Sequence, residues 1–154
     1  MRILFVCLGN ICRSPTAEAV FKKVATEMQL EWHIDSAGTN GYHNGENPDP
    51  RSIAIGKTRG YDVNSISRQV RPEDFEQFDY IFAMDSQNIR ALKKFCPRPQ
   101  LERKVHLVTD FGSEYYEGGV PDPYYGAEQD FHNVIDILED CCKNIVSAIQ
   151  AKRI

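Results

Sequence analysis

A cysteine and an arginine lie six positions apart near the start of the chain, in the segment Cys7-Leu8-Gly9-Asn10-Ile11-Cys12-Arg13-Ser14. A short loop that curls around an anion can point its backbone N–H groups inward, and Gly9 and Asn10 tolerate the backbone angles that such a curl needs. The guanidinium of Arg13 is a planar fork that can bind two phosphate oxygens at once. The segment therefore predicts a phosphate-binding loop over residues 8–14.

The same loop could activate Cys7 as a nucleophile. A free thiol is mostly protonated at neutral pH, whereas a helix N-terminus, a ring of N–H donors and a nearby guanidinium favour the thiolate. Ser14 could donate a further hydrogen bond to the sulfur. The alternative is a buried structural cysteine beside an ordinary turn, because cysteine is among the most buried residue types. The spacing of Cys7 and Arg13 favours a loop that binds a phosphate ester and attacks its phosphorus.

The departing oxygen of a phosphate ester needs a proton, so a carboxylic acid is expected close to this loop. The best candidate is Asp122, in the segment Val120-Pro121-Asp122-Pro123-Tyr124-Tyr125-Gly126. Its two neighbouring prolines lower the entropy cost of presenting one side chain. Asp and Pro also occur together in ordinary polar turns, which is the alternative interpretation. Asp85, at the end of a predicted strand, is the next candidate.

Apolar runs that alternate with amphipathic segments must position these residues. The run at residues 2–7 predicts a buried parallel strand, and Ser14-Pro15 predicts a helix start with Ser14 as N-cap and Pro15 at the first position. One face of that helix is expected to carry Ala17, Val20, Phe21, Val24 and Met28. Further strands are expected at residues 33–37, 79–84 and 104–108, helices at 49–60, 72–75, 86–95 and 128–152, and loops at 38–50 and 109–126.

This order predicts a single doubly wound α/β domain over residues 1–154, with a four-stranded parallel sheet and helices on both faces. Ligands of such sheets bind beyond the carboxyl ends of the strands, where Cys7 is expected. The net charge of −4 gives no reason to expect a nucleic-acid partner. No apolar run approaches the roughly 18 residues that span a membrane, and none resembles a secretory signal, so a cytoplasmic protein without a membrane partner is predicted.

The five cysteines are Cys7, Cys12, Cys96, Cys141 and Cys142. Their odd number and irregular spacing argue against a disulfide scaffold, and no paired CxxC motif suggests zinc. Cys12 could form a reversible disulfide with Cys7 and protect it from irreversible oxidation, or it could simply pack beneath the loop. The other three cysteines are expected to be packing residues.

Residues 7–15 and the segment Asp122-Pro123-Tyr124-Tyr125 resemble the low-molecular-weight protein tyrosine phosphatase family. The resemblance continues through Asp35-Ser36-Ala37-Gly38-Thr39, Gly41-Tyr42, Ser67-Arg68-Gln69, Phe78-Asp79-Tyr80 and Met84-Asp85, and so spans most of the chain. It implies hydrolysis of phosphotyrosine and other aryl phosphate monoesters through a phosphocysteine intermediate. It also implies tyrosine-phosphorylated proteins as substrates, and neither a metal nor another cofactor.

The resemblance further implies individual roles. Cys7 would be the nucleophile, Arg13 the phosphate clamp and Asp122 the proton donor. The loop would be held in shape by Asn10, Ser14 and Ser36. The groove for the substrate ring would be lined by Ile11, Tyr42, Tyr124 and Tyr125. His43 follows Tyr42 where members of the family vary, so the substrate preference stays open.

Three other functions are compatible with an oxyanion loop. An arsenate reductase would need a further pair of cysteines to relay a disulfide, and no closely spaced pair lies in the middle of the chain. A phosphoarginine phosphatase, as the resemblance suggests, would have threonine in place of Ile11, whose apolar side chain suits an aromatic ring. A phosphate-binding or redox-sensing module without turnover would not need Cys7, Arg13 and Asp122 together.

Overall fold

Four parallel strands form one sheet in the order β2-β1-β3-β4. The computed structural model describes residues 1–154, with the elements β1 (Arg2–Cys7), α1 (Arg13–Glu27), β2 (His33–Gly38), α2 (Pro50–Thr58), α3 (Pro72–Gln77), β3 (Tyr80–Ala83), α4 (Ser86–Lys93), the 3₁₀ helix η1 (Pro99–Lys104), β4 (Val105–Leu107), the 3₁₀ helix η2 (Val108–Phe111) and α5 (Glu128–Gln150). The chain order and the strand order confirm the predicted doubly wound α/β fold.

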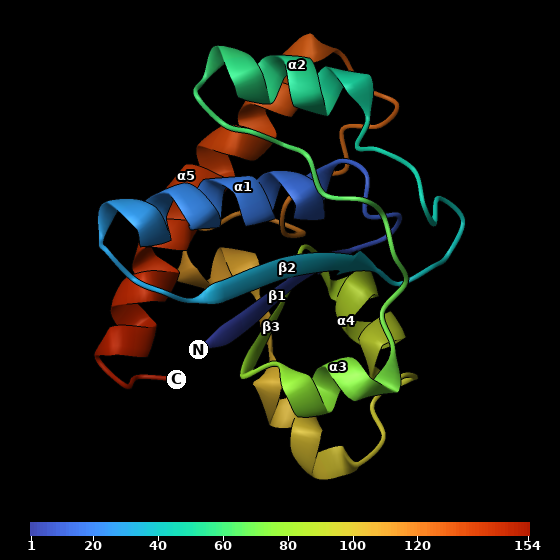
Figure 1. The fold of residues 1–154 in the computed structure, drawn as a ribbon, viewed down its shortest axis with the longest axis vertical. Helices are drawn as coiled ribbons and strands as arrows, with labels where there is room; N and C mark the ends of the chain where they lie inside the picture. The colour runs from blue at the N-terminus through green and yellow to red at the C-terminus, as the bar shows by residue number, and fades with distance from the viewer.

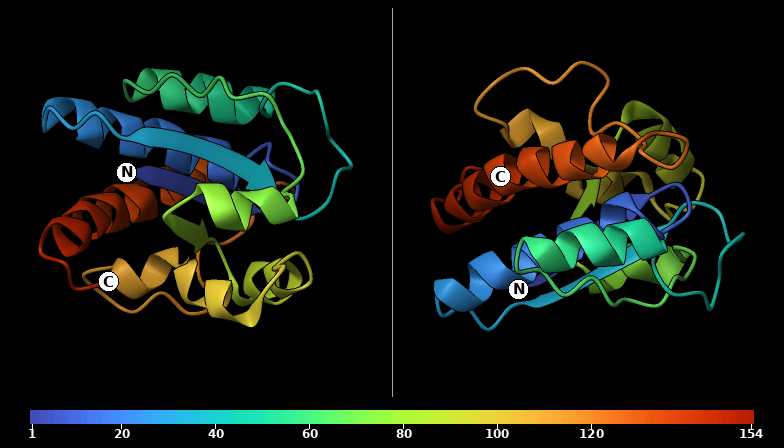
Figure 2. Two further views of the ribbon diagram at one scale, coloured as in Figure 1. Left: turned by 60° about the horizontal axis from the view of Figure 1, so that its bottom comes forward. Right: turned by 90° about the horizontal axis from the view of Figure 1, so that it is seen from above.

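Helices cover both faces of the sheet (Figures 1 and 2). Helices α1 and α5 pack together on one face, with α2 against α5, while α3 and α4 lie on the other. Alternate residues of β1 supply the two cores: Ile3 and Phe5 face α1 and α5, whereas Leu4 and Val6 pack in the cluster that contains residues of α3 and α4. A strand buried on both faces needs apolar residues at every position, which explains its continuous apolar run.

The apolar stripe of α5 lies in the core: Phe131, Val134, Ile135, Leu138 and Cys142 are all buried. The predicted apolar face of α1 is confirmed for Ala17, Val20 and Phe21, which are buried, but Met28 is exposed. The reason is that α1 ends at Glu27, and the chain turns away through Gln29, whose φ is 58°.

The predicted start of α1 is wrong by two residues. The helix begins at Arg13, so Cys12 precedes it and Pro15 is its third residue. Ser14 does not cap the helix, because its hydroxyl is used inside the loop that follows β1. The other bounds shift slightly: α3 runs on to Gln77, and the predicted loop at 109–126 opens with the end of η2.

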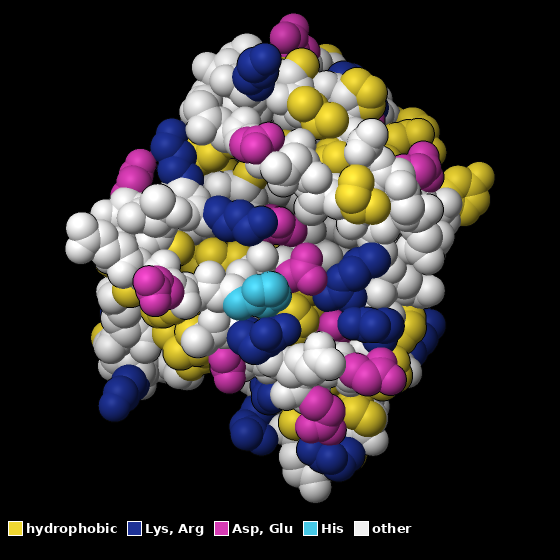
Figure 3. All heavy atoms as spheres, in the orientation of Figure 1, with side chains coloured by type: hydrophobic (Ala, Val, Ile, Leu, Met, Phe, Trp, Pro, Cys, Tyr) yellow, Lys and Arg dark blue, Asp and Glu magenta, His cyan; other side chains and the backbone are white.

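The surface does not carry a single sign of charge on the side seen in Figure 1. Figure 3 shows Lys and Arg side chains interspersed with Asp and Glu over this side of the molecule. None of the helices combines the length and the apolar character that crossing a lipid bilayer requires.

Candidate active site

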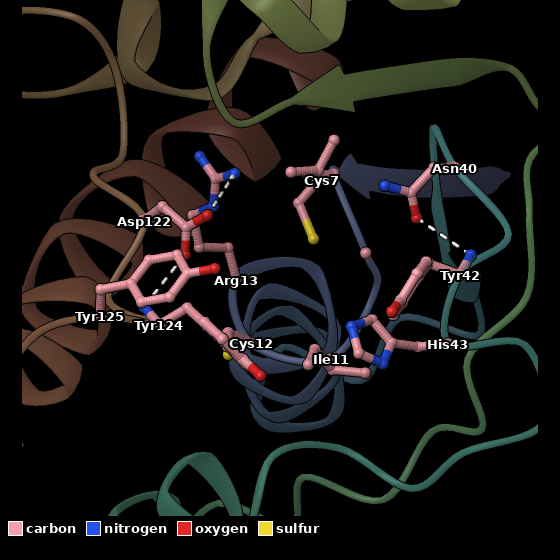
Figure 4. Close-up of a pocket in the computed structure, with 12 residues that line it drawn as sticks. Cys7, Ile11, Cys12, Arg13, Asn40, Tyr42, His43, Asp122, Tyr124 and Tyr125 are labelled. Atoms are coloured by element: carbon pink, nitrogen blue, oxygen red, sulfur yellow. Dashed lines mark hydrogen bonds and ion pairs between the residues drawn. The ribbon is translucent and has the colours of Figure 1, made fainter.

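A pocket of about 330 Å³ lies at the carboxyl end of β1. Three segments line it: the loop after β1 contributes Cys7, Leu8, Gly9, Ile11, Cys12 and Arg13, the loop after β2 contributes Asn40, Tyr42 and His43, and the loop before α5 contributes Asp122, Tyr124 and Tyr125. In Figure 4, Cys7 lies between Arg13 and Asp122 on one side and Tyr42 and His43 on the other. The fold thus brings the predicted nucleophile, clamp, acid and groove residues to one pocket and adds Asn40 and His43, whereas Asn10 and Ser14 of the predicted phosphate loop do not line it.

The loop after β1 curls so that its carbonyls face outward. Three of them accept hydrogen bonds from neighbouring segments: Leu8 O from Asn40 N (3.0 Å), Gly9 O from Ser67 Oγ (3.0 Å) and Ile11 O from Asp49 N (2.8 Å). In a planar trans peptide the N–H points opposite to the C=O, so the following amides turn toward the centre of the loop. Asn10 N accordingly donates to Cys7 Sγ at 3.3 Å. This ring of amides is what an oxyanion requires.

Asn10 makes the sharp turn of the loop, with φ at 57°. Asparagine is one of the few residues that adopt this left-handed conformation readily. Gly9, which was expected to share this role, does not adopt the left-handed conformation. A Cβ at this position would instead lie only 3.0 Å from the His43 side chain, so that ring would have to shift slightly to accommodate it.

A buried hydrogen-bond chain supports the Cys7 sulfur. Asn10 Nδ2 donates to Ser14 Oγ (2.8 Å) and to Ser36 Oγ (3.0 Å), and Arg68 N fixes the Asn10 amide by donating to its Oδ1 (3.1 Å). Because Ser14 Oγ already accepts from Asn10, its own proton can be donated to Cys7 Sγ, 3.0 Å away. Asn10 thus links Ser14 and Ser36, the two other side chains that the resemblance implied would hold the loop in shape.

Glu18, which the sequence analysis did not single out, ends this chain. It is buried, its Oε1 accepts from Ser36 Oγ at 2.7 Å, and its Oε2 accepts from Lys22 Nζ at 2.6 Å. A carboxylate can only accept, so Ser36 must donate to it and present a lone pair to Asn10. The spacing of Ser14 and Glu18, four residues apart on one helix face, was the available signal.

Arg13 enters the pocket from α1 with its guanidinium almost completely buried. Its Nη1 contacts Asp85 Oδ2 at 2.6 Å and Val120 O at 3.0 Å. Burial alone would lower the pKa of Arg13, but the Cys7 sulfur and the Asp85 carboxylate raise it above its ordinary value. The pocket therefore has a permanent positive charge beside the sulfur.

Asp122 is the carboxylate that faces the pocket. Its side chain is 44% exposed, with Oδ2 3.7 Å from Arg13 Nη2, and its Oδ1 accepts from Tyr124 N at 3.1 Å. Asp85, the second candidate acid, does not line the pocket. Both of its oxygens are occupied, one by Arg13 and the other by Asn88 N at the start of α4.

Aromatic side chains form the rim. Tyr42 and Tyr125 are 85% and 95% exposed, and Tyr124 is partly covered at 38%. Ile11 supplies an apolar wall below them (Figure 4). His43 packs edge to face with Tyr42, and its Nδ1 lies 2.8 Å from Glu46 Oε2. A planar ring attached to a phosphate could therefore be held between these side chains.

The five cysteines are all free thiols. Cys12 is a buried residue of the loop around the pocket, and burial together with the nearby Asp49 charge raises the pKa of its thiol to about 12. Cys141 and Cys142 are core residues of α5, as expected, and burial raises both of their pKa values. Cys96 is half-buried and donates to Arg98 O.

The chain is similar to known phosphatases over almost its whole length. The model of the low molecular weight phosphotyrosine protein phosphatase family matches residues 2–154. A putative low molecular weight protein-tyrosine-phosphatase of Synechocystis sp. is 45% identical over 97% of this chain and 96% of its own, and the human low molecular weight phosphotyrosine protein phosphatase is 40% identical over 92% and 90%. A crystal structure of a protein tyrosine phosphatase from Entamoeba histolytica, 51% identical, superposes with a TM-score of 0.96 over 100% of this chain and 99% of that one.

Proposed function

The chain belongs to the low molecular weight phosphotyrosine protein phosphatase family, and from this premise we propose that it hydrolyses phosphotyrosine and other aryl phosphate monoesters through a phosphocysteine at Cys7. One observation carries the proposal. The Cys7 sulfur accepts a hydrogen bond from Asn10 N, has the Ser14 hydroxyl beside it, and shares its pocket with Arg13 and Asp122. A nucleophile, an anion clamp and an acid thus face one site.

In the first step, the Cys7 thiolate attacks phosphorus and the bond to the aryl oxygen breaks. The Asp122 carboxyl group gives its proton to the departing phenol oxygen, which leaves as the neutral phenol. Arg13 and the inward-facing amides of the loop stabilise the charge on the equatorial oxygens. The phosphoryl group is then bonded to the Cys7 sulfur.

In the second step, water hydrolyses the phosphocysteine. Asp122, now a carboxylate, accepts a proton from the attacking water, so the acid of the first step becomes the base of the second. The phosphorus–sulfur bond breaks, phosphate is released, and Cys7 returns as a thiolate. The hydrogen bond from Ser14 stabilises this leaving sulfur, which is 3.0 Å from the hydroxyl.

The rim favours an aromatic ester as the substrate. Ile11, Tyr42 and Tyr124 offer apolar and aromatic surface around the mouth of the pocket. The strongly exposed Tyr42 and Tyr125 leave the mouth open to a protein chain. We therefore assign tyrosine-phosphorylated proteins as the substrate class.

We also propose that Cys12 protects Cys7 from irreversible oxidation. Its raised pKa keeps it as a thiol at neutral pH, so peroxide would first oxidise the Cys7 thiolate to a sulfenic acid, with water as the second product. The Cys12 sulfur would then displace hydroxide from this sulfenic acid, and the thiol proton and the hydroxide would leave together as water. A thiol reductant would restore both cysteines.

The proposed function is tested by turnover and by trapping. The wild-type chain is expected to hydrolyse nitrophenyl phosphate and phosphotyrosine peptides, and to hydrolyse phosphoserine and phosphoarginine peptides far more slowly. Acid quenching during turnover should leave phosphate on the peptide that contains Cys7. Cys7→Ser should bind vanadate but not turn over. Wild-type turnover by Cys7→Ser, or none by the wild type, would contradict the proposal.

A further inference from the structure

Arg51, in the first turn of α2, does not line the pocket, but it binds the Asp49 carboxylate through one edge of its guanidinium. Its Nε lies 3.0 Å from Asp49 Oδ1, and its Nη2 lies 2.9 Å from Asp49 Oδ2. These hydrogen bonds hold the pKa of Asp49 below its usual range. A planar fork on a carboxylate fixes both partners in orientation as well as in distance. The Asp49–Arg51 pair therefore forms one bidentate unit at the start of α2, with the Arg51 side chain 43% exposed.

This unit contacts two of the loops that form the pocket. On one side, Asp49 N donates to Ile11 O in the loop around Cys7, at 2.8 Å. On the other side, Arg51 Nη2 donates to Tyr124 O at 2.9 Å. The same guanidinium lies over the Tyr124 ring, 5.7 Å from its centroid, and over the Phe131 ring of α5 at 4.6 Å. The Asp49–Arg51 pair thus spans the distance between the phosphate loop and the loop that carries Asp122.

The segment around Asp122 has few other supports. It is held before the acid by Val120, whose N donates to Met84 O at 2.8 Å and whose O accepts from Arg13 Nη1 at 3.0 Å. After the acid, Ala127 N donates to Asp130 Oδ2 at 2.7 Å. Within residues 121–125, Tyr124 O is the main-chain atom that is hydrogen-bonded to a side chain from outside the segment. Tyr124 N in turn donates to Asp122 Oδ1. The position of the Tyr124 peptide therefore affects the position of the Asp122 carboxyl group.

We propose that Arg51 is a positioning residue for proton transfer: by holding Tyr124 O and stacking on the Tyr124 ring, it fixes the Asp122 loop relative to the phosphate loop. This inference rests on the proposed role of Asp122 as the proton donor. Proton transfer in a transition state requires the acid within hydrogen-bond reach of the departing oxygen, and small displacements are costly. Arg51 would thus act on the leaving group without touching the substrate.

A role in positioning the acid has a kinetic signature that general loosening of the fold does not have. Good leaving groups depart with little help from an acid, whereas poor ones need the proton. Loss of Arg51 should therefore reduce kcat/KM more for a poor leaving group than for a good one. A general acid typically raises the reaction rate about 100- to 10,000-fold, and a misplaced acid retains part of this rate increase. We therefore expect the ratio of kcat/KM for the good leaving group to kcat/KM for the poor one to rise by about tenfold when Arg51 is lost.

The experiment measures kcat/KM for aryl phosphates with graded leaving groups in the wild type, Arg51→Met and Arg51→Lys. Methionine keeps much of the side-chain volume but has no donor, and the slope against leaving-group acidity should steepen. Lysine can reach Tyr124 O or Asp49 but cannot form the fork, so its slope should lie between the other two. Arg59→Met is the matched control. It removes the ion pairs of Arg59 with Asp136 and Glu139, and should lower the thermal stability without changing the slope.

A double variant tests whether Arg51 acts through Asp122. In an Asp122→Asn background, Arg51→Met should cause no further loss that depends on the leaving group, because the acid is already absent. If Arg51→Met does not fold, Arg51→Lys supports the same comparison. Wild-type turnover with an unchanged slope in the folded Arg51 variants, or a full additional effect in the Asp122→Asn background, would overturn this inference alone. Absence of turnover in the wild type would overturn the proposed function and this inference with it.

Discussion

Asp85 Oδ2 lies 2.6 Å from Arg13 Nη1, and the other oxygen of the same carboxylate accepts from Asn88 N, so one side chain both starts α4 and orients the guanidinium beside Cys7. The two residues are 72 positions apart in the chain. In the sequence, Asp85 is the second candidate for the acid after Asp122. In the structure it supports the residue that would bind the phosphate oxygens.

This relationship predicts the effect of Asp85→Ala. The guanidinium of Arg13 would lose its fixed orientation, and kcat/KM should fall by a similar factor for every aryl phosphate, because Arg13 acts on the equatorial oxygens and not on the leaving group. Loss of the α4 cap should also cost about 1 kcal/mol of stability. Steady-state kinetics over a graded series, with urea unfolding, checks both effects. A loss concentrated on poor leaving groups would instead return Asp85 to the role of acid.

Asp122→Asn should lose most activity toward aryl phosphates that have poor leaving groups. The leaving group of phosphotyrosine is a phenol with an ordinary pKa of about 10, so its departure needs the proton, whereas nitrophenol leaves with less help. Hydrolysis of phosphotyrosine should slow by about 100-fold or more, and hydrolysis of nitrophenyl phosphate by less. The basic limb of the kcat/KM profile against pH should also flatten. An equal loss across the series would mean that Asp122 only shapes its loop.

Glu18→Gln tests the buried chain that runs from Ser36 through Asn10 and Ser14 to Cys7. The glutamine amide can turn a donor toward Ser36, which would weaken the hold on Asn10. We expect a fall of about tenfold in the rate at which iodoacetate alkylates Cys7 at neutral pH, since a hydrogen bond is typically worth about 1 kcal/mol or somewhat more. The control is Glu27→Gln, the same charge change at the exposed end of α1. Equal alkylation rates in the two variants would remove Glu18 from the support of Cys7.

Mild peroxide should inactivate the enzyme reversibly, with a Cys7–Cys12 disulfide as the product. Peptide mass mapping before and after thiol reductant identifies the bond, and inorganic phosphate in the pocket should slow its formation. Cys12→Ala should lose activity to the same peroxide but recover only partly, because the sulfenic acid proceeds to the sulfinic acid. Complete recovery of Cys12→Ala would rule out the protective disulfide.

Acid should weaken the attachment of the loop after η2 to α5. Burial would raise the pKa of Asp140, but hydrogen bonds from Ser113 N and Tyr116 Oη lower it overall. A depressed folded-state pKa stabilises the protein above the ordinary aspartate value of about 3.9, and this contribution disappears as the pH falls through the folded-state pKa. The stability difference between wild type and Asp140→Asn, from urea unfolding, should therefore shrink between pH 6 and pH 3. A difference that does not change with pH would contradict this assignment.

The local sequence was sufficient to predict which residues form the centre of the site. Cys7, the loop and Arg13 lie within one strand–loop–helix unit, so their proximity follows from short-range chain geometry. The fold class was also predictable, because continuous apolar strands and amphipathic helices can be buried together in few ways. Helix ends were less certain. The sequence Ser14-Pro15 suits an N-cap, but the hydroxyl of Ser14 lies beside the Cys7 sulfur and does not cap the helix.

The supports of the site depended on the tertiary structure. Asp85 reaches Arg13 across 72 residues, and Arg51 reaches Tyr124 across 73. No local sequence pattern predicts either contact, because an Arg or Asp at such a position is equally compatible with a solvent-exposed helix face. The sequence alone therefore determined which groups could do the chemistry and which loop holds them. The packing of distant loops at one edge of the sheet decided how each group is oriented, since that depends on which side chains meet in space.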